Sequence, residues 1–281
     1  MSEVRVEFPS GTLRVTCANE ALVGELGSQI VLAERESRVL GQRFTALELD
    51  VWLKGDHLPG KARVRHSLRR LFGVPAPRER EYANFLWLRA RLFRTPEPLA
   101  AGVLVRGGWL RYQFLCTLAL GAHRPLDVAL QDAAPDKRRA WLAELAREVA
   151  RMHALHFVHR DLQWRNVLVT SERIPAHGDQ RALTFIDCWR GGTPLPRRAA
   201  DYDIACLMLE GAGALALDEQ RAFFGLYGAE RAHQGSPVDA RRLLAAAERR
   251  RTELLARIAR EPGRWRASEP PRPSWDWRAV L

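Results

Sequence analysis

The stretch His159–Thr170 reads HRDLQWRNVLVT. It places Asp161 in a polar run and Asn166 five residues later, directly before a short apolar segment. An Asp followed by an Asn occurs in many loops, where both residues cap turns. The meaning of this pair therefore depends on the segments around it.

The flanking segments give the pair an ordered context. Before it, KRRAWLAELAREVARMHALH (137–156) predicts a long amphipathic helix with its stripe at Trp141, Leu145, Val149, Met152 and His156. After it come the strand-like VLV, the turn IPAHGDQR (174–181) and a second apolar run, ALTFIDCWRGG, in which Asp187 ends a strand pattern. Helix, loop, strand, turn, strand and Asp is the order of a kinase catalytic segment.

Phosphoryl transfer needs oxygen ligands for Mg²⁺ and a group that orients the acceptor hydroxyl. We predict that Asn166 and Asp187 hold magnesium and that Asp161 orients the hydroxyl. Arg160 is a further candidate, predicted to tie the loop to the region after Asp187, with a purely structural role as the alternative. Taken singly, the two Asp residues and Asn166 have plain readings as turn caps or a strand-terminal acid.

A cation on the strand side must contact the ATP phosphates. Lysine is scarce in this arginine-rich chain, and Lys54 ends the strand-like LELDVWLK, so we predict it in that role. The helical segment REREYANFLWLRARLF (78–93) offers Glu79 and Glu81 as its partner, and Glu81 is preferred because it directly precedes the apolar stripe. The alternatives are a solvated edge charge for Lys54 and a helix N-terminal acid for Glu81.

The two halves of the 281-residue chain differ in pattern. The first 56 residues predict several antiparallel strands in LRVTC, SQIVLAE and RFTALELDVWLKG, and strands return in GVLVRGG and WLRYQFLCTL. After GAHRPLD helical spacing dominates. We therefore predict an α+β, two-lobed protein-kinase-like fold. A strand-rich, antiparallel-sheet nucleotide-binding lobe spans 1–118, and a mainly helical catalytic and acceptor-binding lobe spans 119–281.

The composition is that of a globular protein, 47% hydrophobic and without repeats. A net charge of +11 favours an anionic partner, although an arginine-biased genome would give the same count. The N-terminus MSEVRVEFPS has an acid and no apolar core, so we expect no secretory signal and a cytoplasmic location. The four cysteines lie far apart, and neither a zinc cluster nor a disulfide framework is expected.

Three segments together, HRDLQWRNVLV, FIDCWRGG and RRAADYDIACL, resemble the lipopolysaccharide core kinases, the Kdo and heptose kinases of protein-kinase-like fold. The resemblance runs from about Leu49 to about Tyr227. It includes REYANFLWLRARLFRTPEPLAAG and Arg190, three residues after Asp187, in place of a DFG motif. It implies an ATP- and Mg²⁺-dependent kinase acting on a heptose or Kdo hydroxyl of the lipopolysaccharide inner core, at the cytoplasmic face of the inner membrane.

The sequence departs from kinases in one respect and leaves other classes open. It has no GxGxxG motif, and NEALVGELGSQIVL offers only Gly24 and Gly27. A small-molecule kinase of the aminoglycoside or choline type is the second reading, although these usually have Gly where Arg160 stands. A protein kinase is the third, because no APE motif or long activation segment follows Asp187. No motif indicates specific nucleic-acid binding, and the oligomeric state stays open.

A basic segment, KARVRHSLRRLFGV, begins at Lys61. It predicts a helix with an apolar face, surrounded by arginines: Val64, Leu68, Leu71 and Phe72 on the face, and Arg63, Arg65, Arg69 and Arg70 around it. One hypothesis is peripheral contact with anionic lipid or with a phosphorylated core glycolipid. The equal alternative is a packed helix with a solvated arginine face.

Overall fold

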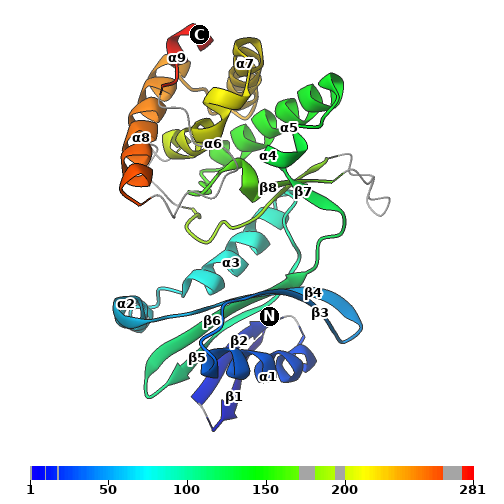
Figure 1. Ribbon diagram of the computed structural model, residues 1–281, viewed down its shortest axis with the longest axis vertical. Coiled ribbons are helices and arrows are strands. Elements are labelled where there is room, and N and C mark those ends of the chain that lie inside the picture. Colours follow the sequence, from blue (N-terminus) through cyan, green and yellow to red (C-terminus); the bar gives the residue numbers. More distant parts are fainter. Residues whose placement is uncertain (1, 10, 18, 171–180, 194–199, 262–273) are drawn as a thin grey trace. The chain divides into compact units, whose positions relative to one another are not determined.

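The computed structural model describes residues 2–9, 11–17, 19–170, 181–193, 200–261 and 274–281. Contacts between Cα atoms divide the chain into two compact units, Met1–Gly121 and Ala122–Leu281. The first unit is built on one antiparallel sheet and the second is mainly helical (Figure 1). The predicted α+β fold class is confirmed.

The first unit contains six strands and three helices among its described residues. The strands are β1 (Ser2–Phe8), β2 (Gly11–Cys17), β3 (Leu40–Ala46), β4 (Leu49–His57), β5 (Pro98–Arg106) and β6 (Trp109–Leu118), and the helices are α1 (Ala21–Arg35), α2 (Gly60–Leu71) and α3 (Pro77–Arg89). The sheet order is β1-β2-β5-β6-β4-β3, with every neighbouring pair antiparallel. Strand β4, which carries Lys54, is therefore paired on both edges.

One predicted strand is wrong, because SQIVLAE lies inside helix α1. Leu22, Leu26 and Ile30 recur at helical spacing and are buried in the core against the sheet. Burial of this whole apolar face outweighs the strand preference of the β-branched residues within it. Gly24 and Gly27 also lie inside α1, so the segment that holds them forms a helix rather than a phosphate-covering loop.

Two predicted helices end earlier than their apolar stripes suggested. Leu92 and His156 have left-handed backbone, with φ of 63° and 60°, and both are exposed. The next residue closes each helix end, since the N–H of Phe93 and that of Phe157 each bond a carbonyl five residues back at 3.0 Å. This is the left-handed end of a helix, which turns the chain away from the stripe.

The second unit combines a small sheet with helices. Strands β7 (His123–Pro125), β8 (Val167–Thr170) and β9 (Leu183–Phe185) are antiparallel in that order. The helices are α4 (Leu126–Ala129), α5 (Pro135–Ala154), the 3₁₀ helix η1 (Trp164–Asn166), α6 (Ala200–Ala214), α7 (Leu217–His233), α8 (Ala240–Arg260) and α9 (Trp277–Val280). Helix α5 packs on α7, and α6 packs on α8. The predicted turn at 174–181 lies outside the described residues except for Arg181.

Within the described ranges, no helix is both long enough and apolar enough to cross a bilayer.

Candidate active site

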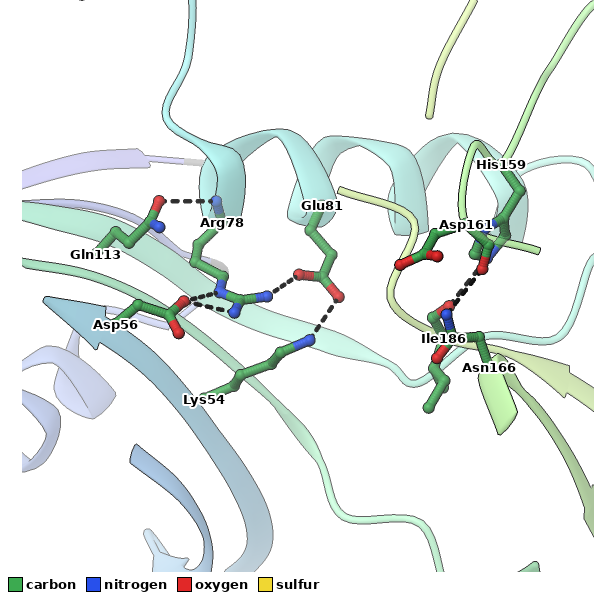
Figure 2. A network of polar contacts seen from close by, with 9 residues as sticks. All are labelled: Lys54, Asp56, Arg78, Glu81, Gln113, His159, Asp161, Asn166 and Ile186. Carbon is green, nitrogen blue, oxygen red and sulfur yellow. Dashed lines mark hydrogen bonds and ion pairs between the residues drawn. The ribbon is translucent and has the colours of Figure 1, made fainter. Parts of the chain in front are cut away.

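Strand β4 and helix α3 bring Lys54 and Glu81 together in the first unit. Lys54 Nζ lies 3.4 Å from Glu81 Oε1 (Figure 2). Alternation along β4 buries Leu53 in the core on one side of the sheet and turns Lys54 to the opposite face. The Glu81 side chain is only 2% exposed, whereas that of Lys54 is 26% exposed. The carboxylate is thus held inside the protein while the amine keeps access to solvent.

Arg78 completes this network, and its role was not predicted from the sequence. Its Nη1 donates to Glu81 Oε2 at 2.7 Å and its Nε donates to Asp56 Oδ2 at 2.7 Å (Figure 2). Its backbone N–H donates to Gln113 Oε1 at 3.3 Å. Glu81 is therefore shared between Lys54 and Arg78, which explains how it stays buried as a hydrogen-bonded carboxylate. The spacing of Arg78 and Glu81, three residues apart on a helix, was the available sequence clue.

In the second unit, η1 and the β8–β9 pair join the segments that carry Asp161, Asn166 and Asp187. Asn166 Nδ2 donates to the Asp161 carbonyl at 2.7 Å. The N–H of Ile186 donates to the Asn166 carbonyl at 3.0 Å. The three predicted residues therefore lie on backbone segments linked by successive hydrogen bonds, part of which Figure 2 shows.

Asp203, on α6, organises the backbone of the HRD loop, and this role was missed from the sequence. Its side chain is 0% exposed. Its two oxygens accept the N–H of His159 and the N–H of Arg160, each at 2.7 Å. His153 Nε2 lies 3.2 Å from the same carboxylate. His159 Nε2 in turn donates to the Ile186 carbonyl at 2.9 Å, one residue before the predicted metal ligand.

Two buried partners contact the two ring nitrogens of His153. His153 Nε2 donates to Asp203, because a carboxylate only accepts. Tyr227 OH lies 2.8 Å from His153 Nδ1. Burial raises the pKa of Tyr227 to about 12.

Two of the predicted site residues, one in the HRD loop and one after β9, store backbone strain. Arg160 and Asp187 have left-handed φ values of 62° and 65°. For a residue other than glycine this conformation costs about 1–3 kcal/mol and is found preferentially at functional sites. The Asp203 carboxylate compensates this cost at Arg160 by binding its N–H. Within the described residues, the Arg160 guanidinium itself makes no hydrogen bond or ion pair, and residues 194–199, part of the region to which it was predicted to connect, lie outside the description.

The donor set in this loop fits a magnesium ion. Asn166 uses its Nδ2 on the Asp161 carbonyl, which leaves its Oδ1 as the coordinating atom. Asp187 contributes a partly exposed carboxylate, and oxygen donors of these two kinds suit Mg²⁺ shared with phosphate and water. The Asp161 side chain is also partly exposed, and its Oδ1 accepts from Gln163 Nε2 at 3.0 Å. Its second oxygen is thus suited to receive a substrate hydroxyl.

Glu210, on α6, couples the stability of this loop to pH. Its Oε2 accepts the N–H of Trp164 at 3.0 Å, where η1 begins, and its Oε1 is buried without a partner among the described residues. Burial raises the pKa of Glu210 from 4.5 to about 7. Between these values the folded state binds the proton that the unfolded state has released, so the free energy of unfolding falls as pH rises.

We therefore expect Glu210→Gln to remove part of this pH dependence. The stability supplied by the Glu210 proton is complete below pH 4.5 and is lost as pH rises through about 7, a loss on the order of 3 kcal/mol. Denaturant unfolding at pH 5, 6, 7 and 8 measures it, with Glu253→Gln on the exposed side of α8 as the matched control. Parallel pH profiles for the two variants would contradict the assignment.

These features define a class. A six-stranded antiparallel unit with a partly buried Lys–Glu pair, followed by a helical unit with an HRD loop and an Asp two residues after β9, is the protein-kinase-like fold.

The family follows from the sequence comparison. The model of the lipopolysaccharide kinase (Kdo/WaaP) family matches residues 34–218, more than half of the chain. The chain belongs to this family, which confirms the resemblance carried by HRDLQWRNVLV and FIDCWRGG. Membership places it among phosphotransferases of the lipopolysaccharide core.

Solved structures share the fold at low identity. WaaP in complex with acyl carrier protein is 21% identical with a TM-score of 0.55, over 86% of this chain and 99% of that one. Glucosamine kinase in complex with glucosamine, ADP and inorganic phosphate is 12% identical with a TM-score of 0.50, over 91% and 85%. At these identities the likeness shows the fold alone. A sequence search of curated proteins gave no match.

Proposed function

We propose that this chain transfers the γ-phosphoryl group of Mg-ATP to a heptose or Kdo hydroxyl of the lipopolysaccharide inner core. The observation that carries the proposal is the hydrogen-bonded arrangement of Asp161, Asn166 and the segment before Asp187, within the region that matches the family model. The acceptor is then a core glycolipid, and the place of action is the cytoplasmic face of the inner membrane.

Each residue has one task in this mechanism. Asp161 accepts a hydrogen bond from the acceptor hydroxyl and aligns its oxygen with the bond that breaks. Lys54 contacts the ATP phosphates, and the Glu81 carboxylate limits where the Lys54 amine can lie. Asn166 and Asp187 would hold Mg²⁺, which when bound supplies positive charge against the negative charge that develops on the phosphoryl oxygens.

The test measures transfer of labelled γ-phosphate from Mg-ATP to purified, dephosphorylated core glycolipid. We expect label in the glycolipid with the wild-type chain and about 10³-fold slower labelling with Asp161→Asn. Parallel reactions offer an aminoglycoside, choline, glucosamine and a protein mixture as acceptors. Label in one of these and none in the glycolipid would reject the lipopolysaccharide acceptor while keeping a kinase.

The Lys54–Glu81 pair predicts a selective effect on ATP. Replacing Glu81 by Gln removes the negative charge between Lys54 and Arg78, so the amine loses its charge-assisted partner. We expect kcat/KM for ATP to fall roughly 10–100-fold, as loss of such a bond typically costs. Steady-state kinetics at varied ATP measures the fall.

Glu79→Gln is the matched control, two residues earlier on α3. Its carboxylate pairs with Arg70 and accepts the N–H of Ala76 at 2.8 Å, without a bond to Lys54. We expect this variant to lose stability but to keep its KM for ATP. Equal kinetic losses in both variants would show that Glu81 acts only through the stability of the helix.

A further inference from the structure

Helix α2 (Gly60–Leu71) and the residue after it carry an apolar surface that nothing in the described first unit covers. Val64 and Leu68 are 45% and 48% exposed, and Leu71 and Phe72 are 80% and 83% exposed. Single exposed apolar residues are ordinary, but four on one helical stripe form a patch that marks an interaction site. We call these four residues the apolar row.

A row of cations flanks the apolar row. Lys61, Arg65 and Arg69 follow one another at four-residue spacing and are all exposed. The helix contains no acidic residue, and none of the three cations pairs with a carboxylate in the described ranges. Burial, and after it the charges of Arg65, Arg69 and Arg80, lower the pKa of the neighbouring His66.

The opposite face of α2 holds the helix to its own unit. This corrects the prediction that Arg63 and Arg70 belong with the other arginines around the apolar face. Arg63 donates from Nε to the Leu58 carbonyl at 3.0 Å, and Arg70 pairs with Glu79 on α3. Ser67 Oγ accepts the N–H of Leu110 on β6 at 3.0 Å. Arg63 and Arg70 therefore do not belong to the outward basic surface, and the docked helix leaves only its apolar and cationic rows for a partner.

We propose that α2 docks on an anionic phospholipid surface, with the apolar row among the upper acyl chains and Lys61, Arg65 and Arg69 among the headgroups. Adjacent apolar and cationic strips on one helix match the two layers of a charged membrane interface. A phosphate headgroup carries the charge complementary to the cations. The large exposed side chains at the helix end, Leu71 and Phe72, insert among the acyl chains. The inference does not depend on the proposed function, since α2 holds none of the predicted active-site residues.

Co-sedimentation of the full chain with phospholipid vesicles tests the proposal. We expect binding to vesicles of phosphatidylcholine with phosphatidylglycerol, weakening with salt, and little binding to pure phosphatidylcholine. Each cation contributes roughly fivefold to such binding, so the double variant Arg65→Gln/Arg69→Gln should bind roughly 30-fold more weakly. Leu68→Ser/Phe72→Ser should lose at least about tenfold, because both exposed side chains insert.

The control is Arg241→Gln/Arg257→Gln, with the same change of charge at exposed positions on α8. It should bind vesicles as the wild type does. The proposal would be overturned if the control and the α2 variants bound vesicles equally. It would also be overturned if the wild type did not bind anionic vesicles, or if α2 bound a soluble acidic protein and not the vesicles. Circular dichroism shows that each variant is folded, and ATP-dependent transfer is measured separately, so vesicle binding without transfer rejects only the proposed function.

Discussion

Asp161→Asn is expected to lower the rate of phosphoryl transfer by about 10³-fold while leaving the fold unchanged. The substitution keeps the size of the side chain, and an amide oxygen can still accept from Gln163 as Asp161 Oδ1 does. It removes the negative charge and one of the two oxygens that can receive a substrate hydroxyl. The backbone carbonyl that holds Asn166 is untouched, so this predicted magnesium ligand keeps its support.

Single-turnover transfer with saturating Mg-ATP measures this loss, and binding of ATP is measured independently. We expect the affinity for ATP to change little, because the predicted phosphate contact comes from Lys54 on β4. Asp132→Asn, an exposed acid in the same unit, is the matched control and should keep the wild-type rate. An Asp161→Asn variant within tenfold of the wild-type rate would remove Asp161 from the mechanism.

Of the variants proposed for this protein, Asp203→Ala should lower the free energy of unfolding most. It leaves the buried N–H groups of His159 and Arg160 without an acceptor and removes the partner of His153. Each unsatisfied buried donor costs about 1–3 kcal/mol, so we expect the free energy of unfolding to fall by about 4 kcal/mol. The left-handed backbone of Arg160 also loses the bond that compensates its strain, and the HRD loop shifts.

The conservative variant Asp203→Asn separates positioning from stability. Its one carbonyl oxygen can accept a single backbone N–H, while its NH₂ faces the other donor. We expect an intermediate loss of stability and a fall in kcat of at least about 10-fold, with KM for ATP unchanged. Denaturant unfolding and kinetics below the unfolding temperature measure both quantities.

Asp201→Asn, two residues earlier on α6, is the control for this series. Burial raises the pKa of Asp201, and its carboxylate pairs with Arg250 at 3.7 Å rather than with the loop. This variant should keep both the stability and the kcat of the wild type. If Asp203→Asn keeps the wild-type kcat as well, Asp203 serves only to hold the fold.

Local chain geometry explains what could be predicted about the site. Asp161, Asn166 and Asp187 sit on one loop and one antiparallel strand pair, so their order and spacing along the chain nearly dictate their neighbourhood. Lys54 and Glu81 lie 27 residues apart, and scarcity of lysine together with the helical stripe was enough to indicate both. The family could be predicted for the same reason, since its motifs are local.

Long-range burial explains what could not be predicted. Asp203 meets His159 and His153 over 44 and 50 residues, and Arg78 meets Asp56 over 22. A charged residue in a sequence looks the same whether it becomes a buried hydrogen-bond hub or a solvated surface group, because the difference lies in distant partners. The same holds for α1, whose helix depends on an apolar face that only the sheet can cover.

The sequence by itself determined the order of the motifs that carry the predicted site residues, the family, and the contrast between a strand-rich and a helix-rich half. Each of these depends on residues close together in the chain. The tertiary structure alone decided which charges are buried and which face outward. It assigned Arg70 to an ion pair with Glu79 and left Arg65 and Arg69 exposed, although all three stand in the same basic run. The physical reason is that solvation and pairing of a charge are set by the elements packed around it, which local sequence does not specify.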